Sequence, residues 1–553
     1  MSAIRRLTPP GIALLGAALL LSACAPAGAV SSGSGEQSSA SSSSASPVTG
    51  GTLTFLESQI PTCLYAGGGG FYPNATLINQ LGDKLTYQDP ETREITPWLA
   101  TEWEVNADAT EYVFHLRDDV TFSDGSPLTA EVVALNFDHF GLGDEALGLS
   151  KQEFVSNYVG SEVVDEHTVK FTFSAPSPGF LQATSVVGST IVAKSTAELP
   201  YEEQCQIDNY VASGPFTVSN VVPEQQYDLA ARDDYDWAPA EDEHQGRAYL
   251  DAISVIVTPE DNVRIGALTS GQADAIRAVQ VYDVANIEAA GSTVYYAPTN
   301  GVNPQFALRP GNPILADIQV RQALQKATDV ETAVKTIYLG KFDVASSVLS
   351  HGATGYEDLS DKFGYDLEGA KKLLDEAGWV EGTDGIRAKD GVKLELTTWP
   401  GAVFPLNQQL DELIAEQWKL AGVQLNIVTP DQATATAGSK DPLQQPVAIT
   451  HVGRVDPDVI WSNFGSKSNR NALGFTPQTA DATLDALLTD ITRLPTTDER
   501  YAKAAEAQEY LIDQAYVIPL YELPQTYAAQ SKVHGLSWEA VGRVDLTDVW
   551  VQQ

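Results

Sequence analysis

Histidine, cysteine and carboxylate side chains are the groups best suited to chemistry, and their spacing in this chain matches no common catalytic site. The seven histidines are scattered, with no pair at metal-ligand spacing. No G-x-S-x-G, H-E-x-x-H, C-x-x-C or Walker A motif occurs, and the four-glycine run at 67–70 lacks a phosphate-binding frame. Carboxylates are so numerous that counting neither supports nor excludes a glycosidase pair. We therefore expect no metal site, no cofactor and no enzymatic activity.

The charge and length of the chain limit its partners and its architecture. The 553-residue chain has a formal net charge of −40 at pH 7. Such an acidic surface repels nucleic acid and anionic lipid head groups, so neither is an expected partner. The simplest explanation of the charge is solubility. A chain of this length exceeds what one hydrophobic core supports, so two or three lobes are expected.

The N-terminal segment has the pattern of an export signal. Arg5 and Arg6 precede an apolar stretch at 11–21, which is well short of the ~20 residues needed to cross a bilayer core. A short apolar core behind positive charge is typical of a signal peptide, which we predict over residues 1–23. No later segment approaches ~18 consecutive apolar residues, so no membrane span is expected elsewhere.

The predicted signal ends in Leu21-Ser-Ala-Cys24, which resembles the lipobox of bacterial lipoproteins. The resemblance implies that Cys24 is acylated on its sulfur and anchors the chain to a membrane. The alternative is an ordinary signal peptide cut after Ala23, with Cys24 incidental. Residues 24–49 form a serine-rich segment that buries too little apolar surface to fold, so we expect a flexible linker there.

Two cysteines remain once Cys24 is assigned to the anchor. An exported chain with two remaining thiols usually pairs them, so we expect a disulfide between Cys63 and Cys205. The alternative is two free, buried thiols. Closing a loop of this length would stabilise the fold by roughly 4–5 kcal/mol in the chain-entropy model.

Helix and strand patterns alternate along the rest of the chain. Thr129 is a plausible N-cap, and Gly378 closes a short amphipathic helix. The predicted strands are 51–57, 110–117, 166–173 and 423–428, and the predicted helices begin at 129 or lie within 316–339, 369–378 and 404–420. This mixture indicates α/β lobes rather than a helical bundle or a β-sandwich.

The stretch at 112–133, which reads YVFHLR, then VTFSDGSPLTAEVV, is similar to the signature of the family 5 solute-binding proteins. These proteins are the extracytoplasmic receptors of ABC importers for peptides, nickel chelates and related solutes. Further matches follow in order at 165–171, 213–216, 232–237, 270–274, 317–324, 365–391 and 517–521. The resemblance covers roughly residues 51–540.

The resemblance implies an α/β fold of two lobes, the type II, cluster C form of the periplasmic-binding-protein-like fold, with an extra subdomain in lobe one. The N- and C-terminal segments both return to lobe one in this family, which would bring Cys63 and Cys205 into neighbouring parts. The implied ranges are 50–95, 205–300 and 510–553 for lobe one, 96–204 for the inserted subdomain, and 301–509 for lobe two.

The resemblance also implies the function. Ligand bound across both lobes favours the closed form, which the importer then recognises, and no bond is made or broken. We expect a lipid-anchored monomer on the outer face of the cytoplasmic membrane, at the cell surface or in the periplasm. It would deliver a peptide-like or other small polar organic solute to an ABC permease. The alternatives are a receptor for a metal chelate on the same fold and a secreted hydrolase on an α/β scaffold.

The peptide receptors of this family often hold the ligand's amino group with an aspartate four residues before a D-P or E-P pair. Here Asp456-Pro457 is present, but Gly453 occupies the anchor position, with Arg454 beside it. The usual ammonium anchor is therefore missing, and Arg454 could instead offer donors to a carboxylate or another anion. Equally, Arg454 could be a rim residue paired with Asp456 or Asp458.

Aromatic residues are further candidates for the ligand site. Trp399 ends the predicted strand LELTTW and offers a stacking surface, with a core position as the alternative. Tyr65 and the pair at 71–72 follow the first strand beside glycines that would let a ligand approach. The predicted ligand-binding residues are Tyr65, Phe71, Tyr72, Arg277, Trp399, His451, Arg454 and Asp456.

Overall fold

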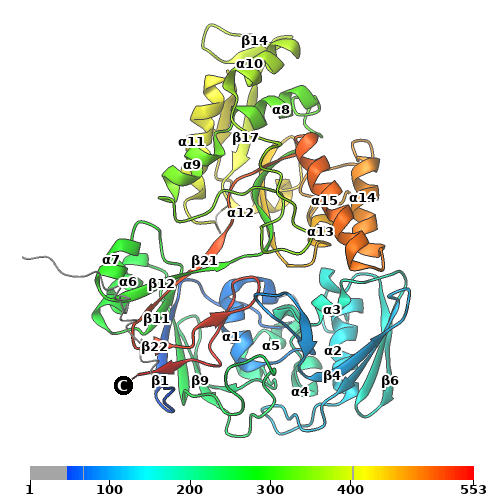
Figure 1. Ribbon diagram of the computed structural model, residues 1–553, viewed down its shortest axis with the longest axis vertical. Helices are drawn as coiled ribbons and strands as arrows, with labels where there is room; N and C mark the ends of the chain where they lie inside the picture. The colour runs from blue at the N-terminus through cyan, green and yellow to red at the C-terminus, as the bar shows by residue number, and fades with distance from the viewer. Residues whose placement is uncertain (1–45, 66–67, 402–403, 553) are drawn as a thin grey trace, which may run out of the picture. The chain divides into compact units, whose positions relative to one another are not determined.

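The computed structural model describes residues 46–65, 68–401 and 404–552 (Figure 1). The predicted signal peptide, Cys24 and nearly all of the serine-rich linker lie outside these residues. Within the described ranges, no helix is long and apolar enough to cross a membrane.

Lobe one is built on a seven-stranded sheet that draws strands from widely separated parts of the chain. Strand β1 lies at its centre, parallel to β10 on one side and to β11 on the other, while the remaining pairings are antiparallel. Leu53 and Phe55 of β1 are fully buried, as the alternating pattern predicts. In sheet order the strands are β12 (Ser292–Pro298), β21 (Pro524–Gln530), β11 (Ala275–Arg277), β1 (Thr52–Glu57), β10 (Ala252–Val257), β9 (Gln226–Ala231) and β8 (Phe216–Val222).

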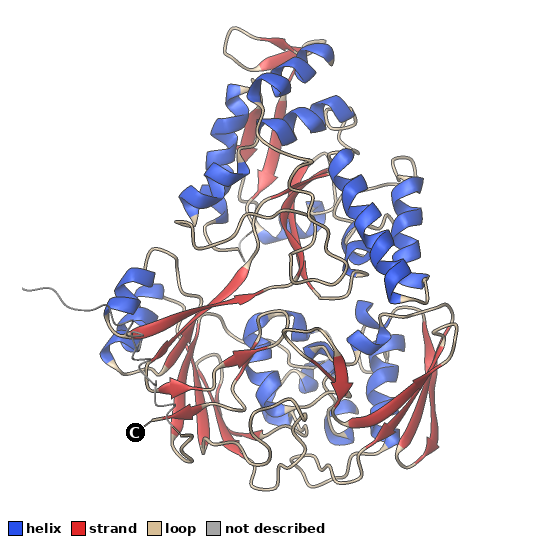
Figure 2. Cartoon of the chain, in the orientation of Figure 1, coloured by secondary structure: helices blue, strands red, loops and turns tan. Residues whose placement is uncertain are grey.

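An inserted subdomain contains an antiparallel four-stranded sheet (Figure 2). Helix α2 begins after Thr129, whose side chain accepts a hydrogen bond from the Val132 amide, which confirms the predicted cap. Phe137 of this helix packs against Phe171 and Phe180. The elements of the subdomain are β4 (Ala100–Val105), β5 (Glu111–Leu116), β7 (Thr168–Phe173) and β6 (Tyr158–Asp165), with α2 (Ala130–Leu142) and α3 (Phe180–Ala183).

Lobe two has a five-stranded sheet with helices on both faces. Along β13, Phe306 and Leu308 contribute to one core with α8–α11, while Ala307 contributes to another with α13–α15. The strands, in sheet order, are β18 (Gln424–Ile427), β17 (Glu395–Trp399), β19 (Val447–Gly453), β13 (Gly301–Leu308) and β20 (Val517–Pro519). Strand β20 falls within the range 510–553 predicted for lobe one but pairs with β13, so the chain leaves lobe two later than predicted.

The three helical regions predicted in lobe two are present with one difference, and four further helices, α12 to α15, were not predicted. The single helical segment predicted within 316–339 is divided, because the Asp329 side chain caps a new helix by accepting from the Thr332 amide. Gly378 has φ of 83°, which suits its predicted place after a helix. The helices are α8 (Ile318–Ala327), α9 (Val330–Ile337), α10 (Leu367–Glu376), α11 (Asn407–Leu420), α12 (Gln432–Gly438), α13 (Val459–Phe464), α14 (Ala482–Arg493) and α15 (Thr497–Asp513).

A disulfide joins Cys63 to Cys205, with their Cα atoms 4.1 Å apart across a sequence separation of 142 residues. Cys63 lies shortly before α1, and Cys205 directly follows α5. The predicted pairing is therefore confirmed. Within the described residues, the remaining α-helices are α1 (Tyr72–Leu81), α4 (Lys194–Ala197), α5 (Tyr201–Gln204), α6 (Asp261–Ser270) and α7 (Val284–Ala289). The remaining strands there are β2 (Thr86–Gln88), β3 (Ile95–Pro97), β14 (Val380–Glu381), β15 (Arg387–Lys389), β16 (Val392–Lys393), β22 (Val533–His534), β23 (Ser537–Trp538), β24 (Val544–Asp545) and β25 (Trp550–Val551).

Candidate ligand-binding site

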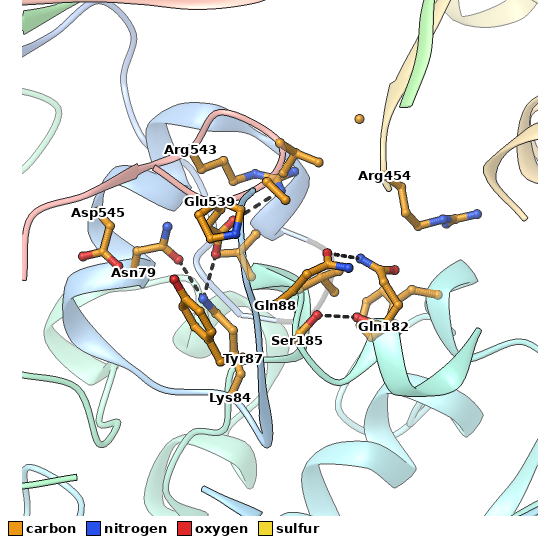
Figure 3. A pocket seen from close by; sticks show the side chains of 18 of the residues that line it. Asn79, Lys84, Tyr87, Gln88, Gln182, Ser185, Arg454, Glu539, Arg543 and Asp545 are labelled. Atoms are coloured by element: carbon orange, nitrogen blue, oxygen red, sulfur yellow. Dashed lines mark hydrogen bonds and ion pairs between the residues drawn. The ribbon is translucent and has the colours of Figure 1, made fainter. Parts of the chain in front are cut away.

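A cavity of about 410 Å³ is lined by five parts of the chain that are distant in sequence. These are the segment after α1, two loops of the inserted subdomain, lobe-one residues between 215 and 242, the end of β19 with the loop after α13, and the C-terminal hairpin β23–β24. Figure 3 shows Lys84, Glu539 and Arg543 on one side of this cavity and Arg454 on the other. Its lining includes Asp83, Lys84, Tyr87, Trp98, Glu153, Gln182, Ser185, Asp242, Gly453, Arg454, Arg470, Trp538, Glu539, Arg543 and Asp545.

Lys84 is a buried cation whose charge is already compensated. It follows α1, and its Nζ donates to Glu539 Oε1 at 2.7 Å and to Asn79 Oδ1 at 3.2 Å. The same ammonium lies 5.2 Å from the centre of the Trp98 ring. The sequence separation of 455 residues between Lys84 and Glu539 shows that the C-terminal segment completes this wall.

Three aspartates also line the cavity, and burial disfavours their ionised forms. Burial raises the pKa of Asp83 to about 6, although Trp237 Nε1 donates to its Oδ2 at 2.9 Å. Burial, followed by repulsion from Asp545, raises the pKa of Asp242. Burial also raises the pKa of Asp545. These carboxyl groups therefore hold protons more readily than exposed aspartates do.

Arg543 is a second buried cation, contributed by the turn between β23 and β24. Its side chain is only 8% exposed, and among the described residues its buried Nε has no hydrogen-bond partner. The carboxylate of Glu539 lies 3.7 Å from its Nη1. The guanidinium carbon lies 5.3 Å from the centre of the Tyr72 ring. Arg543 therefore lines the cavity and has a buried Nε donor that no described residue uses.

Arg454 lies at the cavity as predicted, but carboxylates surround it. Its Nε donates to Asp458 Oδ1 at 3.0 Å, and its Nη1 lies 3.5 Å from Glu153 Oε1. Arg470 Nη2 donates to the same Glu153 oxygen at 3.1 Å. Of the two interpretations left open by the sequence, the ion-paired one matches this geometry. Glu153 belongs to the inserted subdomain, so these contacts join it to lobe two.

Gly453, at the position of the family's usual amino-group anchor, lines the cavity. A Cβ atom there would lie 3.1 Å from Thr299 Cγ2 and 3.5 Å from the Tyr72 hydroxyl oxygen. Tyr72 itself lies beside the cavity wall, where its hydroxyl donates to the Val541 carbonyl at 2.8 Å. Of the two aromatic residues predicted at 71–72, Tyr72 thus supports the turn that carries Arg543. Phe71 is half-buried at the start of α1, next to the lining residue Gly70.

Two predicted charged residues form buried ion pairs away from the cavity lining. Arg277 Nη2 lies 2.7 Å from Glu57 Oε1, within the sheet of lobe one. Asp456 pairs with Arg500, whose Nη2 lies 2.5 Å from Asp456 Oδ1. Glu57 and Asp456 therefore each compensate the charge of a buried arginine, which would be strongly unfavourable without a partner. Their positions indicate structural roles instead of the predicted ligand contacts.

The remaining predicted residues also lie outside the lining. Tyr65 is 2% exposed, and its hydroxyl donates to Asn136 Oδ1 at 3.2 Å in the core of lobe one. Trp399 is 9% exposed at the end of β17, which fits the core alternative. His451 Nδ1 lies 2.7 Å from the Val302 carbonyl oxygen, and burial lowers the pKa of this imidazole to about 4. His451 is therefore neutral near pH 7.

Lys84, Trp98, Asp242 and Arg543 were not predicted as site residues. No local motif marks them, because the cavity brings together segments that lie hundreds of residues apart. The one available signal was the family resemblance, which implies that the C-terminal segment returns to lobe one. It does not indicate which residue of that segment lines the cavity. Among the described residues, no group of three or more His, Cys, Asp or Glu side chains is arranged to hold a metal ion.

Residues 94–472 match the model of the bacterial extracellular solute-binding proteins, family 5 Middle. The chain belongs to this family. The dipeptide-binding protein of Escherichia coli (strain K12) is 28% identical over 409 residues, which cover 68% of this chain and 71% of that protein. Heme-binding protein A of Haemophilus influenzae is 26% identical over 468 residues, which cover 80% of this chain and 81% of that protein.

The fold also matches solved structures. NikA from Brucella suis, solved in complex with Fe(III)-EDTA, has a TM-score of 0.78 at 20% identity, covering 91% of this chain and 100% of NikA. The predicted family, the two-lobed α/β fold with its extra subdomain and the solute-binding role in ABC transport are confirmed. The relatives are solute-binding proteins, and the family is extracellular.

Proposed function

We propose that this chain captures a peptide-like or other small polar organic solute in the cavity beside Lys84 and Arg543 and delivers it to an ABC permease. One observation carries the proposal: a cavity of about 410 Å³ has walls from lobe one, its inserted subdomain and lobe two. A solute that contacts all three parts stabilises the arrangement in which they meet. Binding thereby shifts the population toward the form that the permease recognises, without any bond being made or broken.

We further propose that the protein works as a monomer on the outer face of the cytoplasmic membrane. The Leu21-Ser-Ala-Cys24 stretch supports acylation of Cys24, and the serine-rich segment after it supports a flexible tether. Mass spectrometry of the N-terminal peptide from the exported protein tests this. A diacylglycerol-modified Cys24 at the new N-terminus is expected, whereas an unmodified chain that starts at Cys24 contradicts the anchor.

Native mass spectrometry of the purified protein, before and after mild unfolding, tests the capture of a solute. We expect one small polar organic molecule per chain, released on unfolding. Because Trp98 and Trp538 line the cavity, adding the released molecule back should change the tryptophan fluorescence saturably. A released metal chelate would favour the alternative ligand class, and turnover of added substrates without saturable binding would contradict the receptor role.

A further inference from the structure

Of the five basic residues that line the cavity, Lys151 is exposed to solvent, and the other four differ in whether a carboxylate already compensates them. Lys84 bonds to Glu539, and Arg454 and Arg470 share Glu153. Arg454 also bonds to Asp458. These three cations have little need of a partner from a ligand, because bound carboxylates already balance them. Arg543 is the exception.

Lys84 and Arg543 compete for the carboxylate of Glu539, which explains why Arg543 lacks a hydrogen-bonded carboxylate. The Lys84 ammonium lies 2.7 Å from Glu539 Oε1, within hydrogen-bond distance. The nearest guanidinium nitrogen of Arg543 lies 3.7 Å from Oε2 of the same carboxylate, beyond a normal hydrogen bond. The buried Nε, on another edge of the guanidinium, has no acceptor among the described residues. A buried donor without an acceptor is costly unless a ligand or water supplies one.

The turn that carries Arg543 is held firmly from several sides. The Gly542 amide donates to the Glu539 carbonyl at 2.8 Å, and Gly542 has φ of 75°, which favours glycine. A Cβ atom on Gly542 would meet the Ala297 carbonyl oxygen at 2.9 Å. The Tyr527 hydroxyl donates to the Gly542 carbonyl at 2.8 Å. Because of these contacts, the Arg543 backbone is fixed before any solute arrives, which lowers the entropy lost on binding.

We propose that Arg543 is the seat for a carboxylate group of the captured solute. The inference rests on the proposed receptor function and names the part of the ligand that this side of the cavity takes. The planar guanidinium offers pairs of N–H donors, and a carboxylate accepts two such bonds at once. The anion-binding role that the sequence suggested for Arg454 is thus assigned to Arg543, whose donors are free.

The surrounding aspartates limit the solute to few negative groups. Asp83, Asp242 and Asp545 line the same cavity, and an additional anionic group on the solute would lie close to them. It would repel the carboxylate of Asp83, which is mostly ionised at pH 7 because its pKa is about 6. We therefore expect a solute with one carboxylate to bind better than a dicarboxylate of similar size.

Matched acids and amides provide the test. The wild-type protein, refolded free of endogenous ligand, is incubated with an equimolar mixture of alanyl-alanine, alanyl-glutamine and pyroglutamate, their primary amides, and alanyl-glutamate. Retained molecules are released and quantified by mass spectrometry. Arg543→Gln and Arg543→Lys are treated in parallel. Lys372→Gln is the control, because Lys372 is 76% exposed to solvent and lies outside the cavity lining.

We expect wild type and Lys372→Gln to retain at least one acid about tenfold to a hundredfold over its amide, the range for charge-assisted hydrogen bonds. Arg543→Gln should lose this preference, and Arg543→Lys should keep only part of it. If wild type retains solutes without preferring acids, or if Arg543→Gln keeps the preference, the carboxylate seat is wrong while the receptor proposal stands. If wild type retains nothing from this mixture, the seat is also rejected, and the receptor proposal is judged separately by the co-purified ligand.

Discussion

Arg454 and Arg543 line the same cavity, but their surroundings differ in one decisive respect. Arg454, just after β19 in lobe two, lies between Asp458 and Glu153, and its charge is balanced by the protein itself. Arg543, on the C-terminal hairpin, is equally buried, but the nearby carboxylate of Glu539 bonds to Lys84 instead. The comparison shows that burial of an arginine in a cavity does not by itself indicate a ligand contact. Unused hydrogen-bond donors distinguish the binding residue from the structural one.

The largest effect on stability is expected at the buried ion pair between Asp456 and Arg500, close to Arg454 in sequence. Asp456→Ala leaves the Arg500 guanidinium, 6% exposed, without its carboxylate. We expect the free energy of unfolding to fall by about 3–5 kcal/mol, the cost of breaking a buried pair on one side. Urea unfolding measures it, with Asp119→Ala, from the exposed pair with Arg117, as the control. A loss of unfolding free energy below about 1 kcal/mol would show that the Asp456–Arg500 pair does not stabilise the fold as expected.

The next effect concerns Asp83, which lines the same cavity as Arg543, and it depends on pH. Because the pKa of Asp83 is raised from 3.8 to about 6 in the folded protein, the fold binds a proton that the unfolded chain releases between these values. Ionised Asp83 therefore destabilises the fold above about pH 6, and the penalty disappears as the pH falls toward 4. We expect Asp83→Asn to be more stable than wild type by about 2–3 kcal/mol at pH 7.5.

The advantage of Asp83→Asn should shrink steadily when unfolding is repeated at pH 6, 5 and 4. Asparagine keeps an acceptor oxygen for the Trp237 indole N–H, so the comparison isolates the charge. A difference that stays constant over this pH range would show that the Asp83 carboxyl group is not perturbed.

The third prediction compares the two arginines directly. Arg454→Met removes a compensated charge and leaves Asp458 and Glu153 with fewer partners, so the free energy of unfolding should fall by about 1–2 kcal/mol. Arg543→Met replaces a buried, unsatisfied cation with an apolar chain, and should leave the stability of the ligand-free protein unchanged or raise it by about 1 kcal/mol. Thermal unfolding of both variants checks this. Equal losses of stability in the two variants would contradict the proposed difference between Arg454 and Arg543.

The smallest effect is expected at Glu153, which joins the inserted subdomain to lobe two through two arginines. Its side chain is 30% exposed, so water and salt weaken these ion pairs. Glu153→Gln should speed solute release about two- to fivefold, corresponding to about 0.5–1 kcal/mol. Stopped-flow fluorescence with the co-purified solute measures the rate. Glu162→Gln, from an exposed pair with Lys170 in the same subdomain, should leave it unchanged.

Much of the fold could be predicted from local patterns. Thr129 marks the start of α2, and alternating apolar residues mark β1, because caps and strand faces depend on residues close in sequence. The break between α8 and α9 at Asp329 was missed, since the apolar periodicity continues across it. The boundary near 510 was also misplaced, because pairing of β20 with β13 depends on a partner about 200 residues away.

The candidate site was harder to predict than the fold. Arg454 reaches the cavity as expected, but Arg277 and Asp456 are neutralised by Glu57 and Arg500, partners that no motif reveals. Conversely, Arg543 has no distinctive local pattern. Whether the donors of an arginine are free depends on which carboxylates the tertiary structure brings within hydrogen-bond distance, and sequence spacing contains no such distance.

The sequence by itself determined the family, the two-lobed fold and the choice of cysteine pair. Ordered motifs, strand and helix periodicity and a count of cysteines are properties of the chain read in order. Only the tertiary structure decided which charged groups face the cavity with their donors free. Glu539 lies 455 residues from Lys84, and its bond to that lysine leaves Arg543 available. A choice among competing charges depends on distance and burial, which exist only once the chain has folded.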